Sequence, residues 1–171
     1  MDLKKYVRGI QDFPIPGVLF RDITTVLSDP TALKAAVDAM ASLTQGLEFD
    51  AVLGPESRGF IFGMPIAYNL NKGFVPVRKS GKLPAETCAK EYALEYGTAT
   101  IEIHRDAIKP GKKFIVVDDL LATGGTAKAA AELVAEMGGI VVAQIFFIEL
   151  AGLNGRNMLK GQDIRSLLIY D

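Results

Sequence analysis

The chain of 171 residues contains a single cysteine, Cys88, and a single histidine, His104. One cysteine cannot form a disulfide within the chain, and its scarcity suits a reducing compartment. One thiol and one imidazole also exclude a zinc site built from several Cys and His ligands. No apolar stretch approaches the ~20 residues of a membrane-spanning helix, and residues 1–10 are too charged for a signal peptide. These absences predict a cytoplasmic protein that does not enter a membrane.

The chain has no excess of either charge, because 19 basic and 20 acidic residues leave a formal net charge of -1. This balance argues against nucleic acid or an anionic membrane as a partner. It leaves open a local basic pocket for a small phosphorylated ligand. With 49% hydrophobic residues, a chain of this length can bury a core without disulfide or metal support. Repeats and linkers are missing, so we expect one domain over residues 1–171.

Apolar residues are arranged in a regular alternation of strand and helix patterns. Residues 30–47 show helical spacing behind a Ser28-Asp29 cap, and Gly138-Gly139 closes a later Ala-rich helix. Strands are predicted at 50–54, 74–77, 113–119, 140–150 and 166–170, and further helices at 59–70 and 126–137. Continuous Val and Ile runs between helices predict an α/β fold with an open, mostly parallel twisted sheet and flanking helices.

The segment at 87–104 does not follow this alternation. It mixes charged, β-branched and aromatic residues around Gly97, with alternating apolar residues on its second arm. It is either a hairpin or a mobile flap, and nothing in its pattern places it in the parallel sheet.

The stretch from Phe114 to Thr126 carries the strongest chemical signal. An apolar strand ends in Asp118-Asp119, and a Gly/Thr turn then opens a helix. Ligands of open α/β sheets bind beyond the carboxyl ends of strands, and a helix start offers free amides to an anion. Two carboxylates would repel a bare phosphate, so they indicate sugar hydroxyls or a cation that accompanies phosphates. The alternative is two exposed strand-end acids before a tight turn.

Two other nucleotide-binding signatures are absent. No two glycines stand two positions apart, which excludes the Rossmann fingerprint. Gly54 and Gly59 have the spacing of a P-loop, but Phe60 stands where the lysine is required.

The stretch around Asp118 resembles the phosphoribosyl-diphosphate motif of the type I phosphoribosyltransferases, in the form found in members that act on adenine. Residues 13–23, 56–60, 78–84 and 94–97 are similar to other blocks of that family, in the same order. The resemblance therefore spans nearly the whole chain. It implies the type I phosphoribosyltransferase fold, with a small hood or flap at about 80–104.

The resemblance implies transfer of the 5-phosphoribosyl group from 5-phosphoribosyl 1-diphosphate to adenine, giving AMP and diphosphate, as in purine salvage. The reaction would displace diphosphate at the anomeric carbon through an oxocarbenium-like state, without a covalent nucleophile. Mg²⁺ would be bound mainly through the phosphoribosyl diphosphate, and the protein would have no metal site of its own. Members of the family generally work as homodimers.

The resemblance also gives roles to residues that bind the donor. Asp118 and Asp119 would hold the ribose hydroxyls. The 5'-phosphate would be held by Ala122, Thr123, Gly124, Gly125 and Thr126. The diphosphate loop would be Glu56, Ser57 and Arg58, usually with a cis peptide bond between its first two residues. A basic loop with Arg78, Lys79 and Lys82 would serve the same end of the donor.

Two further blocks would bind the purine base and transfer a proton to or from it. Leu19, Phe20 and Arg21 would contact the purine, partly through backbone groups. Glu95 would transfer a proton at the base and Tyr96 lies beside it, so that Glu95 and Arg58 are the catalytic candidates. Without the resemblance, Phe20 reads as a core residue, Glu95 as a surface carboxylate, and Arg58 as a helix cap or a partner of Glu56.

Two rival functions remain at this stage. The acceptor can be another 6-substituted purine, such as hypoxanthine or guanine, because a few hydrogen bonds decide between them. The chain can also be a transcription regulator that senses phosphoribosyl diphosphate. The matching blocks leave no room for a DNA-binding domain, and the near-neutral charge and Glu95-Tyr96 also argue against a regulator.

Overall fold

The computed structural model describes residues 1–93 and 97–171, which form two compact units, Met1–Ala39 and Met40–Asp171. The N-terminal unit holds a two-stranded antiparallel hairpin that the sequence patterns did not predict. Its elements are the 3-10 helix η1 (Leu3–Tyr6), β1 (Arg8–Gln11), β2 (Leu19–Asp22), α1 (Thr24–Ser28) and most of α2 (Pro30–Ser42).

An ion pair joins the two strands of this hairpin. Arg8 lies opposite Asp22, and its Nε donates to Asp22 Oδ2 at 3.0 Å. The backbone N–H of Thr24 and then the Arg8 guanidinium lower the pKa of Asp22 to about 2. The carboxylate therefore stays charged at neutral pH and fixes the end of β2.

Helix α2 begins where the sequence predicts and ends earlier. Asp29 Oδ1 accepts the backbone N–H groups of Thr31 at 2.9 Å and Ala32 at 2.8 Å, which makes Asp29 the N-cap. The predicted helix ran to residue 47, but the chain turns after Ser42. There the Thr44 hydroxyl donates to the Ala41 carbonyl at 2.7 Å, an alternative to continuing the helix.

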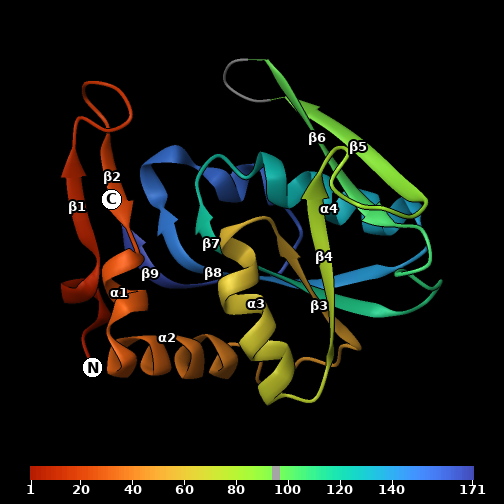
Figure 1. Cartoon of the computed structure of the whole chain (residues 1–171), viewed down its shortest axis with the longest axis horizontal. Coiled ribbons are helices and arrows are strands. Elements are labelled where there is room, and N and C mark those ends of the chain that lie inside the picture. Colours follow the sequence, from red (N-terminus) through yellow and green to blue (C-terminus); the bar gives the residue numbers. More distant parts are fainter. Residues whose placement is uncertain (94–96) are drawn as a thin grey trace. The chain divides into compact units, whose positions relative to one another are not determined.

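The second unit is built on a seven-stranded sheet, shown in Figure 1. Its strands in chain order are β3 (Ala51–Pro55), β4 (Gly73–Lys79), β5 (Thr87–Ala93), β6 (Thr98–His104), β7 (Lys113–Leu121), β8 (Ile140–Leu150) and β9 (Ile164–Tyr170). The spatial order is β5-β6-β4-β3-β7-β8-β9, and the five strands from β4 to β9 are parallel. The expected open, mostly parallel sheet is confirmed.

The irregular segment at 87–104 forms two antiparallel strands, β5 and β6. Strand β6 also pairs with β4 through Arg78 and Lys79, so the hairpin extends the sheet at one edge. Nothing in the residue pattern of 87–104 predicted this pairing. It is stabilised by Ile101 and Ile103, which are buried in the same core cluster as Val75.

Helices α3 (Arg58–Asn69) and α4 (Gly125–Glu136) cover opposite faces of the sheet. Val52 lies toward α3, where a Cβ on Gly63 would come within 3.5 Å of its side chain. The next residue, Leu53, shares a buried cluster with Leu133 of α4. Successive strand residues point to opposite faces, so the two helices bury both sides of β3.

Two short 3-10 helices, η2 (Ala151–Leu153) and η3 (Gly155–Leu159), connect β8 to β9. None of the helices in the described part of the chain is long and apolar enough to cross a membrane.

Candidate active site

A cavity of ≈ 220 Å³ opens where β3 and β7 end. Its walls bring together the predicted diphosphate loop, the two aspartates and the predicted phosphate turn. The lining residues are Glu56, Ser57, Arg58, Asp118, Asp119, Leu120, Leu121, Ala122, Thr123, Gly124, Gly125, Thr126 and Ala127. Parallel strands end at the same edge of a sheet, which is why segments some 60 residues apart meet here. Sequence reasoning did not include Leu120, Leu121 and Ala127, whose apolar side chains carry no chemical signal.

The predicted phosphate turn forms a concave backbone segment at the start of α4, called the cradle below. Gly124 is the N-cap with a φ of 87°, in the left-handed region that favours glycine. A Cβ there would also lie 2.7 Å from the carbonyl oxygen of Gly155 in η3. The first turn of α4 leaves backbone N–H groups without helical partners, and the helix dipole adds positive potential. The cradle suits an anion such as a phosphate.

The two aspartates differ in their surroundings. Asp118 Oδ1 accepts the backbone N–H of Asp119 at 2.8 Å. Burial, and then the negative charge of Asp119, raise the pKa of Asp118 well above its ordinary value. Burial also raises the pKa of Asp119, but the Arg58 guanidinium opposes this. The pair is therefore held in an environment that favours hydrogen-bond donors or a cation from a ligand.

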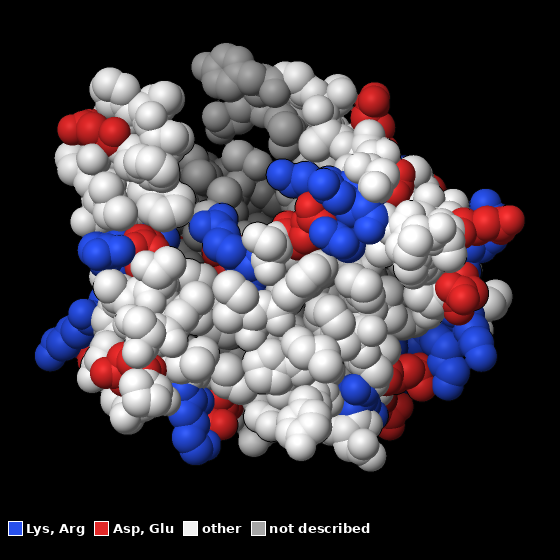
Figure 2. Space-filling view, in the orientation of Figure 1, with Lys and Arg blue, Asp and Glu red and all other residues white. Residues whose placement is uncertain are grey.

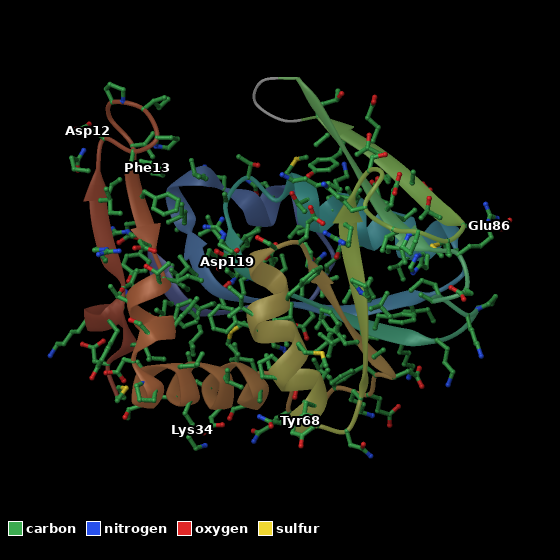
Figure 3. The ribbon with its side chains drawn as sticks, viewed as in Figure 1. Asp12, Phe13, Lys34, Tyr68, Glu86 and Asp119 are labelled. Atoms are coloured by element: carbon green, nitrogen blue, oxygen red, sulfur yellow. The ribbon has the colours of Figure 1, made fainter. Side chains whose placement is uncertain are left out.

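Arg58 and Glu56 each have a partner across the site. Arg58 Nε lies 2.9 Å from Asp119 Oδ2, and Figure 3 shows Asp119 beside the start of α3. Arg78 Nε donates to Glu56 Oε2 at 2.6 Å. The alternative pairing of Arg58 with Glu56 is thus not what the structure has. The peptide bond between Glu56 and Ser57 is cis, as the resemblance implies.

The basic loop does not line this cavity. Arg78 reaches it through Glu56, while Lys79 and Lys82 are exposed. Figure 2 shows that Lys and Arg side chains alternate with Asp and Glu on this face of the molecule and do not form one positive block.

Glu102 holds the basic loop in place, a function that sequence reasoning missed. This buried carboxylate on β6 accepts the Ser80 hydroxyl at 2.6 Å and the Gly81 backbone N–H at 3.1 Å. The sequence carried no signal for this role, because an acid between Ile101 and Ile103 is the usual alternation of a strand with one solvated face.

Two groups of predicted site residues remain, one on β2 and one at Glu95 and Tyr96. Leu19, Phe20 and Arg21 belong to β2 of the N-terminal unit. There the Phe20 ring makes an edge contact with Phe13, with ring centroids 5.1 Å apart. Glu95 and Tyr96 lie outside the residues that the structure describes.

Comparison with known proteins matches the chain to one family. The family model for the phosphoribosyl transferase domain matches residues 22–157. The chain is 60% identical to the adenine phosphoribosyltransferase of Lachnoclostridium phytofermentans, over 98% of this chain and 97% of that one.

Solved structures agree with this. The crystal structure of adenine phosphoribosyltransferase from Thermoanaerobacter pseudethanolicus superposes with a TM-score of 0.96 at 52% identity, covering 99% of this chain and 98% of that one. The Saccharomyces cerevisiae enzyme, solved with an imino-altritol bisphosphate and adenine, gives a TM-score of 0.91 at 38% identity, covering 97% and 96%.

A mostly parallel sheet with an acid pair and a glycine cradle at its carboxyl edge is the arrangement of a type I phosphoribosyltransferase. The chain belongs to the phosphoribosyltransferase family, among the adenine phosphoribosyltransferases. The resemblance stated from the sequence is confirmed.

Proposed function

We propose that the chain transfers the 5-phosphoribosyl group from 5-phosphoribosyl 1-diphosphate to adenine, giving AMP and diphosphate. The observation that carries this is that the Asp118-Asp119 pair and the cradle at Gly124 line the same cavity. One molecule with ribose hydroxyls beside a 5'-phosphate satisfies both halves of that cavity. The relative from Lachnoclostridium phytofermentans is an adenine phosphoribosyltransferase, which supports adenine as the acceptor.

The donor's ribose and 5'-phosphate are the ligands that this site stabilises best. Free amides of the cradle, with the hydroxyls of Thr123 and Thr126, donate to the phosphate oxygens. The ribose hydroxyls donate to Asp118 and Asp119. Each hydrogen bond to a carboxylate favours its charged form, which offsets the burial that raises the pKa of Asp118.

The diphosphate end is served by Arg58 and the basic loop. Arg58 and Arg78 already have carboxylate partners, Asp119 and Glu56, which hold the two guanidinium groups before the substrate binds. A guanidinium can bind a diphosphate through two parallel hydrogen bonds. Lys79 and Lys82 are exposed at the loop and add positive charge.

The residues fit a magnesium ion that arrives with the donor. Among the described residues, no group of three or more acidic, His or Cys side chains could hold a metal ion by itself. Mg²⁺ is commonly bound by one or two carboxylates together with substrate phosphates, and Asp118 and Asp119 are the carboxylates available here. When bound, it would neutralise charge on the departing diphosphate.

The reaction needs no covalent nucleophile. A ring nitrogen of adenine forms a bond to the anomeric carbon, the carbon–oxygen bond to diphosphate breaks, and the ring nitrogen loses its proton. Positioned cations stabilise the leaving group, and the carboxylates stabilise positive charge that develops on the ribose. Glu95 exchanges a proton with the base, while Leu19, Phe20, Arg21 and Tyr96 hold it.

Three further proposals follow from the family. Residues 1–171 act as one phosphoribosyltransferase domain with a flap at about 80–104, the chain works as a homodimer, and it resides in the cytoplasm. Light scattering at working concentrations checks the dimer, since a fully active monomer would contradict it.

A product assay tests the function directly. The chain is incubated with phosphoribosyl diphosphate, Mg²⁺ and each of adenine, hypoxanthine, guanine and xanthine, with and without a chelator. We expect AMP formation with adenine to dominate and to stop when the cation is removed. Equal or better turnover of a 6-oxopurine would reject adenine as the preferred acceptor. If no product forms with any of the four bases, the proposed phosphoribosyltransferase activity is rejected.

A further inference from the structure

Strand β5 lies along helix α4, the helix whose first turn forms the cradle. Lys90 Nζ is 3.2 Å from Glu132 Oε2 and 2.5 Å from Glu136 Oε1, both on α4. Hydrogen bonds to Glu136 and Glu132 raise the pKa of Lys90. Side chains two apart on a strand share a face, so Tyr92 points toward α4 as Lys90 does.

Tyr92 contacts two residues of the cradle. Its hydroxyl is 3.0 Å from Thr126 Oγ1, and either oxygen can be the donor. Its ring lies over Gly125, where a Cβ would be 3.5 Å from Tyr92 Cδ2. Tyr92 lines a neighbouring cavity and is not on the wall of the catalytic one, whereas Thr126 is on that wall. An effect of the Tyr92 hydroxyl on a ligand in the cradle therefore passes through Thr126, and an effect of its ring passes through Gly125.

A phosphate in the cradle determines the direction of this hydrogen bond. A hydroxyl has one proton to donate, and the oxygens of a phosphate dianion only accept. When Thr126 donates to the phosphate, its Oγ1 is left to accept, and the Tyr92 hydroxyl can supply that proton. Hydrogen bonds arranged in such a chain polarise one another.

The Thr126 side chain also needs a partner to keep its orientation. A threonine hydroxyl can take more than one χ1 rotamer and can hydrogen-bond to any acceptor within its reach, so a fixed partner decides where it points. The Tyr92 hydroxyl can accept from Thr126 and donate to it, so it favours the Thr126 rotamer whose hydroxyl reaches the cavity.

We propose that Tyr92 is a positioning residue for the donor's 5'-phosphate, which it serves by orienting the Thr126 hydroxyl. The inference rests on the proposed function in one respect, that the cradle holds the 5'-phosphate. It adds that recognition of this phosphate depends on strand β5, outside the motif that binds it.

Tyr92→Phe removes the hydroxyl and keeps the ring over Gly125. Isothermal calorimetry compares the binding of AMP with that of adenosine, which differs only by the phosphate. We expect AMP affinity to fall about 2- to 13-fold, the range of one net hydrogen bond, and adenosine affinity to stay unchanged. In turnover, KM for phosphoribosyl diphosphate should rise by a similar factor with kcat little changed.

Tyr68→Phe is the matched control, because Tyr68 is on α3 and its side chain is 81% exposed. Thr126→Val completes a double-mutant cycle. In the Thr126→Val background, Tyr92→Phe should have no further effect on AMP affinity, since the partner is already gone.

Three results would overturn the proposal: unchanged AMP affinity in Tyr92→Phe, an equal loss of AMP and adenosine affinity, or additive effects of Tyr92→Phe and Thr126→Val. An equal loss would mean that Tyr92 only supports packing between β5 and α4. Failure of the proposed function is seen separately, as a wild-type chain that forms no AMP from adenine.

Discussion

Arg58 and Asp119 form an ion pair that joins the first turn of α3 to the end of β7, with Nε 2.9 Å from Oδ2. The Arg58 side chain is 43% exposed and that of Asp119 is 7% exposed. The pair thus has a buried acidic end, at the predicted ribose site, and an accessible basic end, at the predicted diphosphate site. In the proposed complex, Asp119 accepts hydrogen bonds from the ribose and Arg58 donates to the diphosphate.

Arg58→Gln should weaken the use of phosphoribosyl diphosphate. Loss of a charge-assisted hydrogen bond predicts a fall in kcat/KM for the donor of about 10- to 100-fold. Because Arg58 lowers the pKa of Asp119, the acid limb of the pH–rate profile should also move to higher pH. Steady-state kinetics measure both. Arg105→Gln, at an exposed arginine 3.9 Å from Glu86, is the control and should behave as wild type.

Asp118→Asn should increase stability while it lowers activity. The pKa of Asp118 is raised in the folded state, so its charge opposes folding above that pKa, and the opposition disappears below the unfolded value of about 3.9. The variant should therefore be more stable than wild type at pH 8, with a difference that shrinks toward pH 4.

Thermal unfolding at several pH values tests this, with Asp106→Asn at an exposed position as the comparison. An Asp118→Asn variant that is less stable than wild type at pH 8 would show that the carboxylate is already well satisfied.

Two neighbouring glycines give a matched test of the cradle. Gly124→Ala places a side chain at positive φ and against the Gly155 carbonyl, and the conformation alone costs about 1–2 kcal/mol. Gly125→Ala meets only ordinary contacts at 3.5 Å. We expect Gly124→Ala to lower the melting temperature and the affinity for AMP, and Gly125→Ala to change both much less. Calorimetry that ranks the two in the opposite order would contradict the geometry.

Glu95→Gln tests proton transfer to the base. The variant keeps the shape of the side chain and loses its ability to exchange a proton, so kcat should fall by about 10²–10⁴-fold with little change in donor affinity. Single-turnover measurements separate this from a binding effect. A wild-type rate in that experiment would leave catalysis to Arg58, the basic loop and the cation.

The central strands were predictable because each is a continuous run of apolar residues, which is typical of strands buried on both faces. Strand β8 matches its predicted range, and β3, β4 and β7 overlap theirs. The hairpin of β1 and β2 was not predicted, since each strand has four residues with mixed polarity.

The hydrogen-bond and ion-pair partners of the site residues could not be predicted from the sequence. Arg58 and Arg78 were identified as basic groups of the site, but which carboxylate each one meets depends on the order of β4, β3 and β7 in space. Hydroxyl contacts such as that of Tyr92 with Thr126 depend in the same way on β5 lying along α4.

The contact between Gly124 and Gly155 gives the cradle a rigid back wall. A Cβ on Gly155 would collide with the Ala122 carbonyl and lie 2.9 Å from Leu121 Cδ1, so the two segments touch backbone to backbone. Glu149 and Arg156 fix the wall, with Arg156 Nε and Nη2 each 2.7 Å from a carboxylate oxygen. We therefore expect the turn to keep its conformation when an anion binds, so that binding requires little reorganisation. The shape of the cradle thus constrains the sequence at a glycine 31 residues after Gly124, which is not among the residues that line the cavity.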